Sequence, residues 1–314
     1  MKIIYMSFAI VFSFVLLKAQ DKTSPFNSIN FNELYEYGVK NFSTGNIEES
    51  ENYFLEALKI KPNDITILKY LAEIAVANKN LIMISYYYDK VLTLDSRDED
   101  ALISLGVIHL NYGNIKRAKE FLLEAVNNEP KNELALFNLS ILYGTIGEYS
   151  TAVNALKKLI SYNPYNAKYY ETIGMYYLSQ NLFSDAEDNF LEALRYDKNL
   201  IESRKGLVIL YQNQSELNES LKYIKELETL IPDLQDLNIL KAYQQYLQGE
   251  IETAIKYALQ ENEEYPEEPD AYYLLSDLYK ITGNELKSRY YLERAKKLNK
   301  DYSAKTVYSF LNIK

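Results

Sequence analysis

Few side chains in this 314-residue chain could carry out covalent or metal chemistry. The chain has no cysteine, which excludes thiol nucleophiles, thiolate metal sites and disulfides, and His109 is its only histidine. A Ser-His-Asp arrangement would have to use His109, and the chain has neither a nucleophile-elbow sequence nor a glycine-rich phosphate loop. We therefore predict a protein that is not an enzyme and that uses no cofactor and no metal.

The acidic side chains form two clusters, at residues 95–100 (DSRDED) and 261–270 (ENEEYPEEPD). Neither cluster has the ligand spacing of a calcium loop. Acidic residues are favoured in the first turn of a helix, which accounts for Glu99, Asp100 and Asp270. We expect solvated turns that connect helices, and the alternative is a docking patch for a basic partner.

Prolines and glycines recur along the chain with a period of 34 residues or a multiple of it. The prolines in one phase are Pro62, Pro130, Pro164, Pro232 and Pro266. The glycines in a second phase are Gly45, Gly113, Gly147, Gly249 and Gly283. Because these two residue types interrupt regular structure, a fixed period predicts copies of one supersecondary unit.

Eight unbroken copies of 34 residues fit the chain, and they begin at Phe31, Ile65, Glu99, Glu133, Ala167, Ile201, Gln235 and Pro269. Positions 8 and 20 of the copies are small in seven of eight cases, whereas positions 4, 7, 11 and 24 are mostly large and apolar or Tyr. Small residues let two helices approach, and large ones fill the crossing. Glycine at position 15 suits a positive φ between helices, and proline at position 32 ends the second helix.

This pattern resembles the tetratricopeptide repeat over residues 31–302. The resemblance implies an all-α, right-handed superhelical solenoid of about eight helix-turn-helix units. Three copies depart from the pattern. The second has Lys79, Ile84 and Ser96, the sixth has Arg204, Val208 and Ser215, and the seventh has Asn238, Lys241 and Glu261.

The two ends of the chain differ from the repeats. Residues 1–19 combine Lys2 with an uncharged apolar run, which predicts a cleaved export signal; a short membrane anchor is the alternative. Residues 20–30 are expected to be a flexible lead, and residues 303–314 a C-terminal capping helix. We expect an exported protein, periplasmic or envelope-associated. The net charge of −10 argues against nucleic acid or an anionic membrane as the main partner.

In the resembled family, positions 2, 5, 9 and 12 of each first helix line a concave groove. Apolar residues at these positions in copies three to five would form a stripe that consists of Ile103, Val107, Leu110, Phe137, Ile141, Met175 and Leu178, with Asn138 beside it. Gly144 would leave a gap for a ligand side chain, and an aromatic set follows at Tyr243, Tyr246 and Tyr273. The alternative is that these side chains are partly buried between neighbouring helices. His109, at position 11, is expected to be a packed, half-buried residue.

These features predict a scaffold that binds a protein or peptide in its groove, within an assembly of the cell envelope. Three alternatives stay open: a membrane-tethered assembly factor, a self-associating solenoid that forms homo-oligomers and, less favoured, an enzyme or carbohydrate-binding module. The sequence does not identify the partner.

Overall fold

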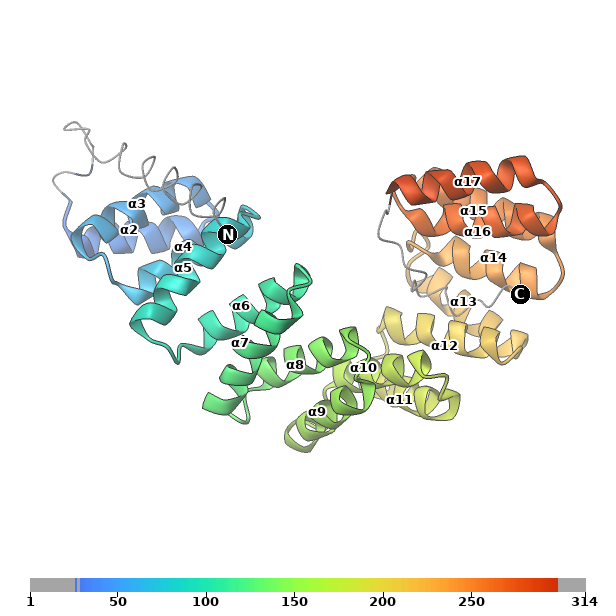
Figure 1. Ribbon diagram of the computed structural model, residues 1–314, viewed down its shortest axis with the longest axis horizontal. Coiled ribbons are helices and arrows are strands. Elements are labelled where there is room, and N and C mark those ends of the chain that lie inside the picture. Colours follow the sequence, from blue (N-terminus) through green and yellow to red (C-terminus); the bar gives the residue numbers. More distant parts are fainter. Residues whose placement is uncertain (1–25, 27–28, 299–314) are drawn as a thin grey trace. The chain divides into compact units, whose positions relative to one another are not determined.

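The structure is a computed structural model that describes residue 26 and residues 29–298. The described part of the chain forms sixteen α-helices, labelled α2 to α17, and contains no β-strand (Figure 1). In chain order the helices are α2 (Phe31–Ser43), α3 (Ile47–Ile60), α4 (Ile65–Ala77), α5 (Leu81–Leu94), α6 (Glu99–Asn111), α7 (Ile115–Asn128), α8 (Glu133–Thr145), α9 (Tyr149–Tyr162), α10 (Ala167–Ser179), α11 (Phe183–Tyr196), α12 (Ile201–Asn213), α13 (Leu217–Leu230), α14 (Leu237–Leu247), α15 (Ile251–Glu264), α16 (Pro269–Ile281) and α17 (Glu285–Leu298).

The helix boundaries follow the 34-residue period. In seven of the eight copies the first helix starts at the residue that opens the frame, and in all eight the second helix starts at position 17. Pro62 lies two residues beyond the end of α3, as expected for a residue that cannot continue a helix. In the seventh copy α14 starts two residues late, at Leu237, because Asp236 has a positive φ of 71°.

The turn inside each pair is also periodic. Position 15 has a positive φ in all eight copies, and five of these residues are glycines with φ between 69° and 84°. Lys79, Asn181 and Ser215 occupy the same position in copies two, five and six, at φ of 53°, 58° and 61°. All eight copies therefore share this backbone conformation, although three of them lack glycine. The conformation is sterically unfavourable for a residue that has a Cβ atom.

Glycine at position 8 allows the two helices of a pair to approach. A Cβ atom added at Gly38 would lie 2.6 Å from the Phe54 ring, and one at Gly106 would lie 2.7 Å from Leu122. The partner is position 24 of the same copy in both cases. Buried Ser50, at position 20, donates a hydrogen bond of 2.9 Å to the carbonyl oxygen of Gly38. The predicted role of the small residues is thus confirmed.

The chain divides into two compact units between Leu142 and Tyr143, inside α8. In the first unit, the largest cluster joins buried side chains of α2 to α6, such as Phe54, Ile67 and Leu71. In the second unit, one cluster centres on Phe190 and α12, and another joins α14, α15 and α16. Helices that are consecutive in the sequence pack as pairs, which confirms the all-α helical-repeat fold.

The terminal segments fall outside the described residues. This applies to the predicted signal (residues 1–19), to most of the lead (residues 20–30) and to the predicted capping helix (residues 303–314). Among the helices within the described residues, none is long and apolar enough to cross a membrane.

Candidate partner-binding surface

In the first unit, the predicted stripe lies on α6 and α8. Ile103 is only 5% exposed and packs with Leu102, Ala125 and Ala135, so it belongs to the core. The other predicted residues here are half-buried, namely Val107, Leu110, Phe137, Asn138 and Ile141. Leu134, at position 2 of copy four, is 58% exposed and extends this apolar surface.

In the second unit, the predicted residues divide in the same way. Leu178 and Tyr243 are buried, at 1% and 7% exposure, and therefore cannot present a contact surface. Met175, Tyr246 and Tyr273 are half-buried. The Tyr246 ring stacks on Tyr243, with ring centroids 5.7 Å apart. Full burial thus removes one residue of the stripe in each unit and one tyrosine of the aromatic set. The half-buried residues also fit the alternative of partial burial between neighbouring helices.

The gap expected at Gly144 is occupied. A Cβ atom at Gly144 would overlap the ring of Tyr176, which also contacts the Tyr149 ring at a centroid distance of 5.8 Å. Gly144 therefore makes room for a side chain of the protein itself, and the prediction of an entry point for a ligand was wrong. The glycine does mark a place where another group approaches the backbone closely, but that group is Tyr176.

His109 is half-buried, as predicted, and its ring stacks on Phe121 with centroids 5.6 Å apart. Burial lowers the pKa of the imidazole, and the nearby Arg117 guanidinium lowers it further, while Asp89 opposes them. The half-buried imidazole, stacked on Phe121 of α7, is a packing element of the α6–α7 pair.

The first acidic cluster takes part in a helix joint. Asp98 caps α6 by accepting a hydrogen bond from the backbone N–H of Ala101 at 3.0 Å. Asp98 and Asp100 both contact the Lys69 ammonium, at 2.8 and 2.7 Å. These carboxylates therefore connect α4 to the start of α6 in addition to being partly solvated.

In the second acidic cluster, the expectation of solvated side chains is wrong for Glu261, which is 1% exposed. Its two carboxylate oxygens accept hydrogen bonds from the backbone N–H groups of Asp236 and Asn238, at 2.7 and 3.2 Å. Burial raises the pKa of the Glu261 carboxyl, although these two N–H groups lower it. A residue that departs from the repeat pattern thus caps α14.

Glu171 is a second buried carboxylate, and the sequence pattern did not single it out. It is 3% exposed, and Oε2 accepts hydrogen bonds from the Ser203 N–H (3.1 Å) and the Ser203 hydroxyl (2.9 Å). Its other oxygen, Oε1, contacts the Lys168 ammonium at 2.6 Å. Glu171 and Ser203 lie 32 residues apart, so no local motif could have revealed this contact.

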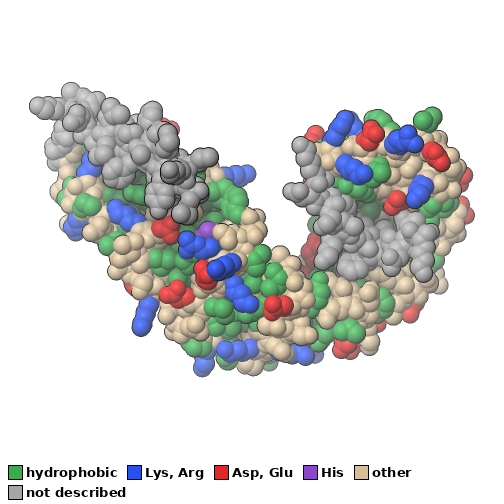
Figure 2. Space-filling view, in the orientation of Figure 1, with side chains coloured by type: hydrophobic (Ala, Val, Ile, Leu, Met, Phe, Trp, Pro, Cys, Tyr) green, Lys and Arg blue, Asp and Glu red, His purple; other side chains and the backbone are tan. Residues whose placement is uncertain are grey.

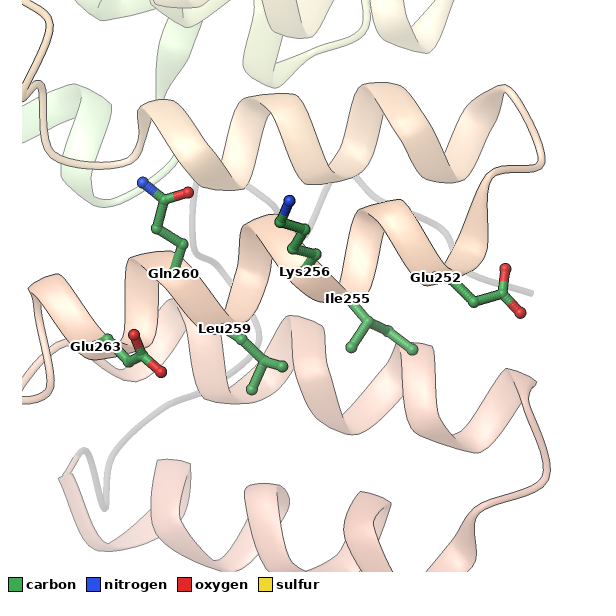
Figure 3. Close-up of a pocket in the computed structure, with 6 residues that line it drawn as sticks. All are labelled: Glu252, Ile255, Lys256, Leu259, Gln260 and Glu263. Atoms are coloured by element: carbon green, nitrogen blue, oxygen red, sulfur yellow. The ribbon is translucent and has the colours of Figure 1, made fainter.

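A depression of about 480 Å³ lies on the outer surface of α15 (Figure 3). The described residues that line it all belong to α15, with Ile255 and Leu259 on one side of the helix and Lys256 and Gln260 on the other. A surface lined by one helix cannot enclose a small ligand. No group of three or more metal-binding side chains occurs within the described ranges.

A sequence profile described as the tetratricopeptide repeat matches residues 35–64, 99–132, 134–166 and 269–302. These four segments are tetratricopeptide repeats. The four matched segments correspond to copies one, three, four and eight. Copies two, six and seven, which depart from the pattern in the sequence, are among those that the profile does not match, although their helices follow the same period.

Solved structures with similar folds include a tetratricopeptide repeat protein from Parabacteroides merdae, with a TM-score of 0.61 and 18% identity, covering 87% of this chain and 94% of that one. Another is pilF of Pseudomonas aeruginosa, with a TM-score of 0.56 and 17% identity, covering 68% of this chain and 96% of that one. Similarity at these identities concerns the fold alone.

In sequence, the chain is 25% identical over 191 residues to the protein O-mannosyl-transferase TMTC3 of Homo sapiens. That match covers 60% of this chain and 21% of TMTC3. The chain therefore spans about a fifth of the length of this curated relative.

Proposed function

We propose that this protein is a non-catalytic scaffold that binds a protein or peptide through the apolar surface of α6 and α8. The observation that carries the proposal is the combination of half-buried Val107, Leu110 and Phe137 with exposed Leu134 at inner positions of successive first helices. The core beneath this surface contains Leu102, Ile103 and Ala135, and Val107 packs against it, whereas Leu134 stays exposed. Apolar side chains that remain accessible beside a filled core favour contact with a partner.

The chemistry of this surface favours an amphipathic partner segment. Branched aliphatic and aromatic side chains at helical spacing accept apolar anchors of a helix or an extended peptide. Asn138 lies within this surface and donates its side-chain amide to the Leu134 carbonyl oxygen at 2.8 Å, which leaves its Oδ1 atom available as an acceptor for a polar partner group. The chain has a net charge of −10, so basic residues that flank the apolar anchors would increase the rate of association.

We further propose that the protein acts after export, in the envelope or periplasm, on the basis of residues 1–19. Cell fractionation with sequencing of the mature N-terminus tests this part. Cleavage near residue 19 and recovery in the soluble envelope fraction would support it, whereas retention of residues 1–19 in the membrane would favour the tethered alternative.

The binding proposal is tested by capture of partners from the native envelope fraction with the full chain and with Phe137→Glu/Ile141→Glu. A matched control is Ile60→Glu/Ile82→Glu, which places the same charges at exposed apolar residues of α3 and α5. Circular dichroism checks that all three proteins stay helical. Partners lost only by Phe137→Glu/Ile141→Glu would support the α6–α8 surface, and partners kept by all three would contradict it.

A further inference from the structure

A group of acidic side chains adjoins the proposed binding surface where α4 meets the start of α6. Lys69 of α4 contacts the carboxylates of Asp98 and Asp100 at 2.8 and 2.7 Å, which places α4 beside the start of α6. Glu73 lies one turn after Lys69 on the same face of α4, and both Glu73 and Asp100 are exposed. We call Glu73, Asp98 and Asp100, with Lys69 among them, the acidic patch.

The charges of the acidic patch do not balance. Its three carboxylates lie near one ammonium, which leaves a net charge of −2. The turn before α6 adds Arg97 together with Asp95, whose charges cancel. Among the described residues, none forms an ion pair or a hydrogen bond with the Glu73 carboxylate.

The surroundings of Glu73 also disfavour its negative charge. Partial burial raises the pKa of the Glu73 carboxyl, the Asp100 carboxylate raises it further, and the Lys69 ammonium lowers it. Because Lys69 is already in contact with two other carboxylates, it compensates Glu73 only in part. An additional cation beside Glu73 would therefore stabilise the charged form of this side chain.

Apolar side chains continue from the acidic patch along the same helix faces. On α4, Val76 follows Glu73 by one turn and is 52% exposed. On α6, Val107 and Leu110 share the face that begins with Asp100, and both are half-buried. Figure 2 shows hydrophobic side chains beside acidic and basic ones on the visible face of the first unit. The surface is thus acidic where α4 meets the start of α6, and apolar further along α6 and on α8.

We propose that the segment which binds the α6–α8 surface carries a Lys or Arg that contacts the acidic patch beside Glu73. This inference rests on the proposed function and adds a direction to it, because the segment is basic at one end and apolar where it contacts Val107, Leu110 and Phe137. An acidic segment would place like charges beside Glu73 and would be repelled.

The helix spacing sets the distance between the two ends of the segment. Packed helices lie about 10 Å apart, and an extended chain advances about 3.3 Å per residue. A segment that crosses one or two helices therefore places its Lys or Arg about three to six residues from its apolar anchors.

Selection from a displayed library of random peptides on the full chain tests this proposal. Each selected peptide is tested again on Phe137→Glu/Ile141→Glu, and those that no longer bind are ligands of the α6–α8 surface. We expect these ligands to contain Lys or Arg more often than the unselected library does, on one side of their apolar residues. Selection on Glu73→Lys should lose this preference.

A labelled synthetic copy of one such ligand measures the effect of Glu73 by fluorescence anisotropy. We expect Glu73→Lys to weaken its binding by at least about tenfold, because like charges then face each other, and binding to the natural chain should weaken with salt. The control Glu48→Lys changes the net charge by the same amount at an exposed residue of α3, and it should bind like the natural chain. Circular dichroism checks that the variants stay helical.

Two outcomes would overturn this inference and leave the proposed function intact. The first is a set of α6–α8 ligands with no excess of Lys or Arg over the unselected library. The second is equal binding of the synthetic ligand to Glu73→Lys and Glu48→Lys. A library that yields no peptide sensitive to Phe137→Glu/Ile141→Glu would instead contradict the proposed function, and this inference with it.

Discussion

The first helices of copies one to five and those of copies six and seven begin in different ways. In the early copies, the residue before the helix is Asn or Asp and its side chain accepts a backbone N–H of the first turn, as for Asn30, Asp64, Asp98, Asn132 and Asn166. In copy six the equivalent residue is Leu200, which cannot cap. The caps of α12 and α14 come instead from Glu171 and Glu261, which are distant in sequence.

This difference shows that one physical requirement has two solutions in one repeat array. The first backbone N–H groups of every helix need acceptors, and a neighbouring Asp or Asn supplies one at little cost. A carboxylate from a packed helix supplies the same acceptor and also connects two elements, but it must be buried. We call an acceptor from a packed helix a tertiary cap and an acceptor from the residue before the helix a local cap. The start of a helix therefore depends on packing when its cap is tertiary, and does not when its cap is local.

The largest effect is expected at Glu261. Replacement by Ala removes the acceptor for the N–H groups of Asp236 and Asn238 at a buried site. We expect the free energy of unfolding of the second unit to fall by about 3 kcal/mol, since each unsatisfied buried donor costs about 1–3 kcal/mol. Urea denaturation measures this loss. Glu263→Ala, at an exposed residue of the same helix, is the control, and equal losses for both variants would contradict the tertiary cap.

We expect a smaller difference in the free energy of unfolding between variants that remove one or the other kind of cap. We expect Glu171→Ala to cost about 2 kcal/mol, because Ser203 loses an acceptor in a buried place and Lys168 loses its partner. Asp64→Ala removes a local cap of α4 and should cost about 1 kcal/mol. Urea denaturation of the two variants under the same conditions gives the comparison, and a larger loss for Asp64→Ala would reverse our ranking.

At position 15, glycine should stabilise the copies that lack it. Lys79→Gly and Ser215→Gly remove a Cβ atom from a left-handed backbone conformation, and we expect each to raise the free energy of unfolding by up to about 1 kcal/mol. Asn181→Gly should gain less, because Asn tolerates this conformation better. Thermal unfolding followed by circular dichroism provides the measurement. Destabilisation by Lys79→Gly and Ser215→Gly would show that these side chains make contacts which outweigh the strain.

The smallest expected effect is a change in the free energy of unfolding with pH. Burial raises the pKa of Glu261 above its ordinary value, so the folded protein holds this proton more tightly than the unfolded chain. The stability due to Glu261 is therefore greatest at acid pH and decreases as the pH rises through the raised pKa. The natural chain should therefore lose stability relative to Glu261→Gln as the pH rises above 4.5, the ordinary pKa of a Glu carboxyl. Chemical denaturation across that range would contradict this assignment if the difference stayed constant or changed in the opposite direction.

The sequence predicts most of the fold because the repeat is encoded in local residues. Gly45 and Pro62 mark the turn and the helix end in one copy, and their counterparts mark the same places in others. The period then places Lys79 and Ser215 correctly, although neither is a glycine. By contrast, nothing local predicts that Glu261 is buried, because its acceptor role depends on how α14 packs on α15.

The predicted surface is only partly accessible because accessibility, like the burial of Glu261, depends on packing between elements. A groove position is defined by helical phase, whereas burial depends on the neighbouring copy. Ile103 and Leu178 are covered, and Gly144 is filled by Tyr176 at a distance of 32 residues in sequence. Leu134 was available from the pattern at position 2, and its apolar type at an otherwise polar position is the signal that could have identified it.

Site-specific crosslinking in the producing cells tests the central claim, partner binding on α6 and α8, most directly. A photoreactive residue replaces Leu134, at the exposed edge of this surface, and in a separate protein it replaces Ile82, which is 64% exposed on α5. We predict a discrete adduct with another protein from residue 134 and none from residue 82. Identical adducts from both residues, or an adduct from residue 82 alone, would contradict the assignment of partner binding to this surface.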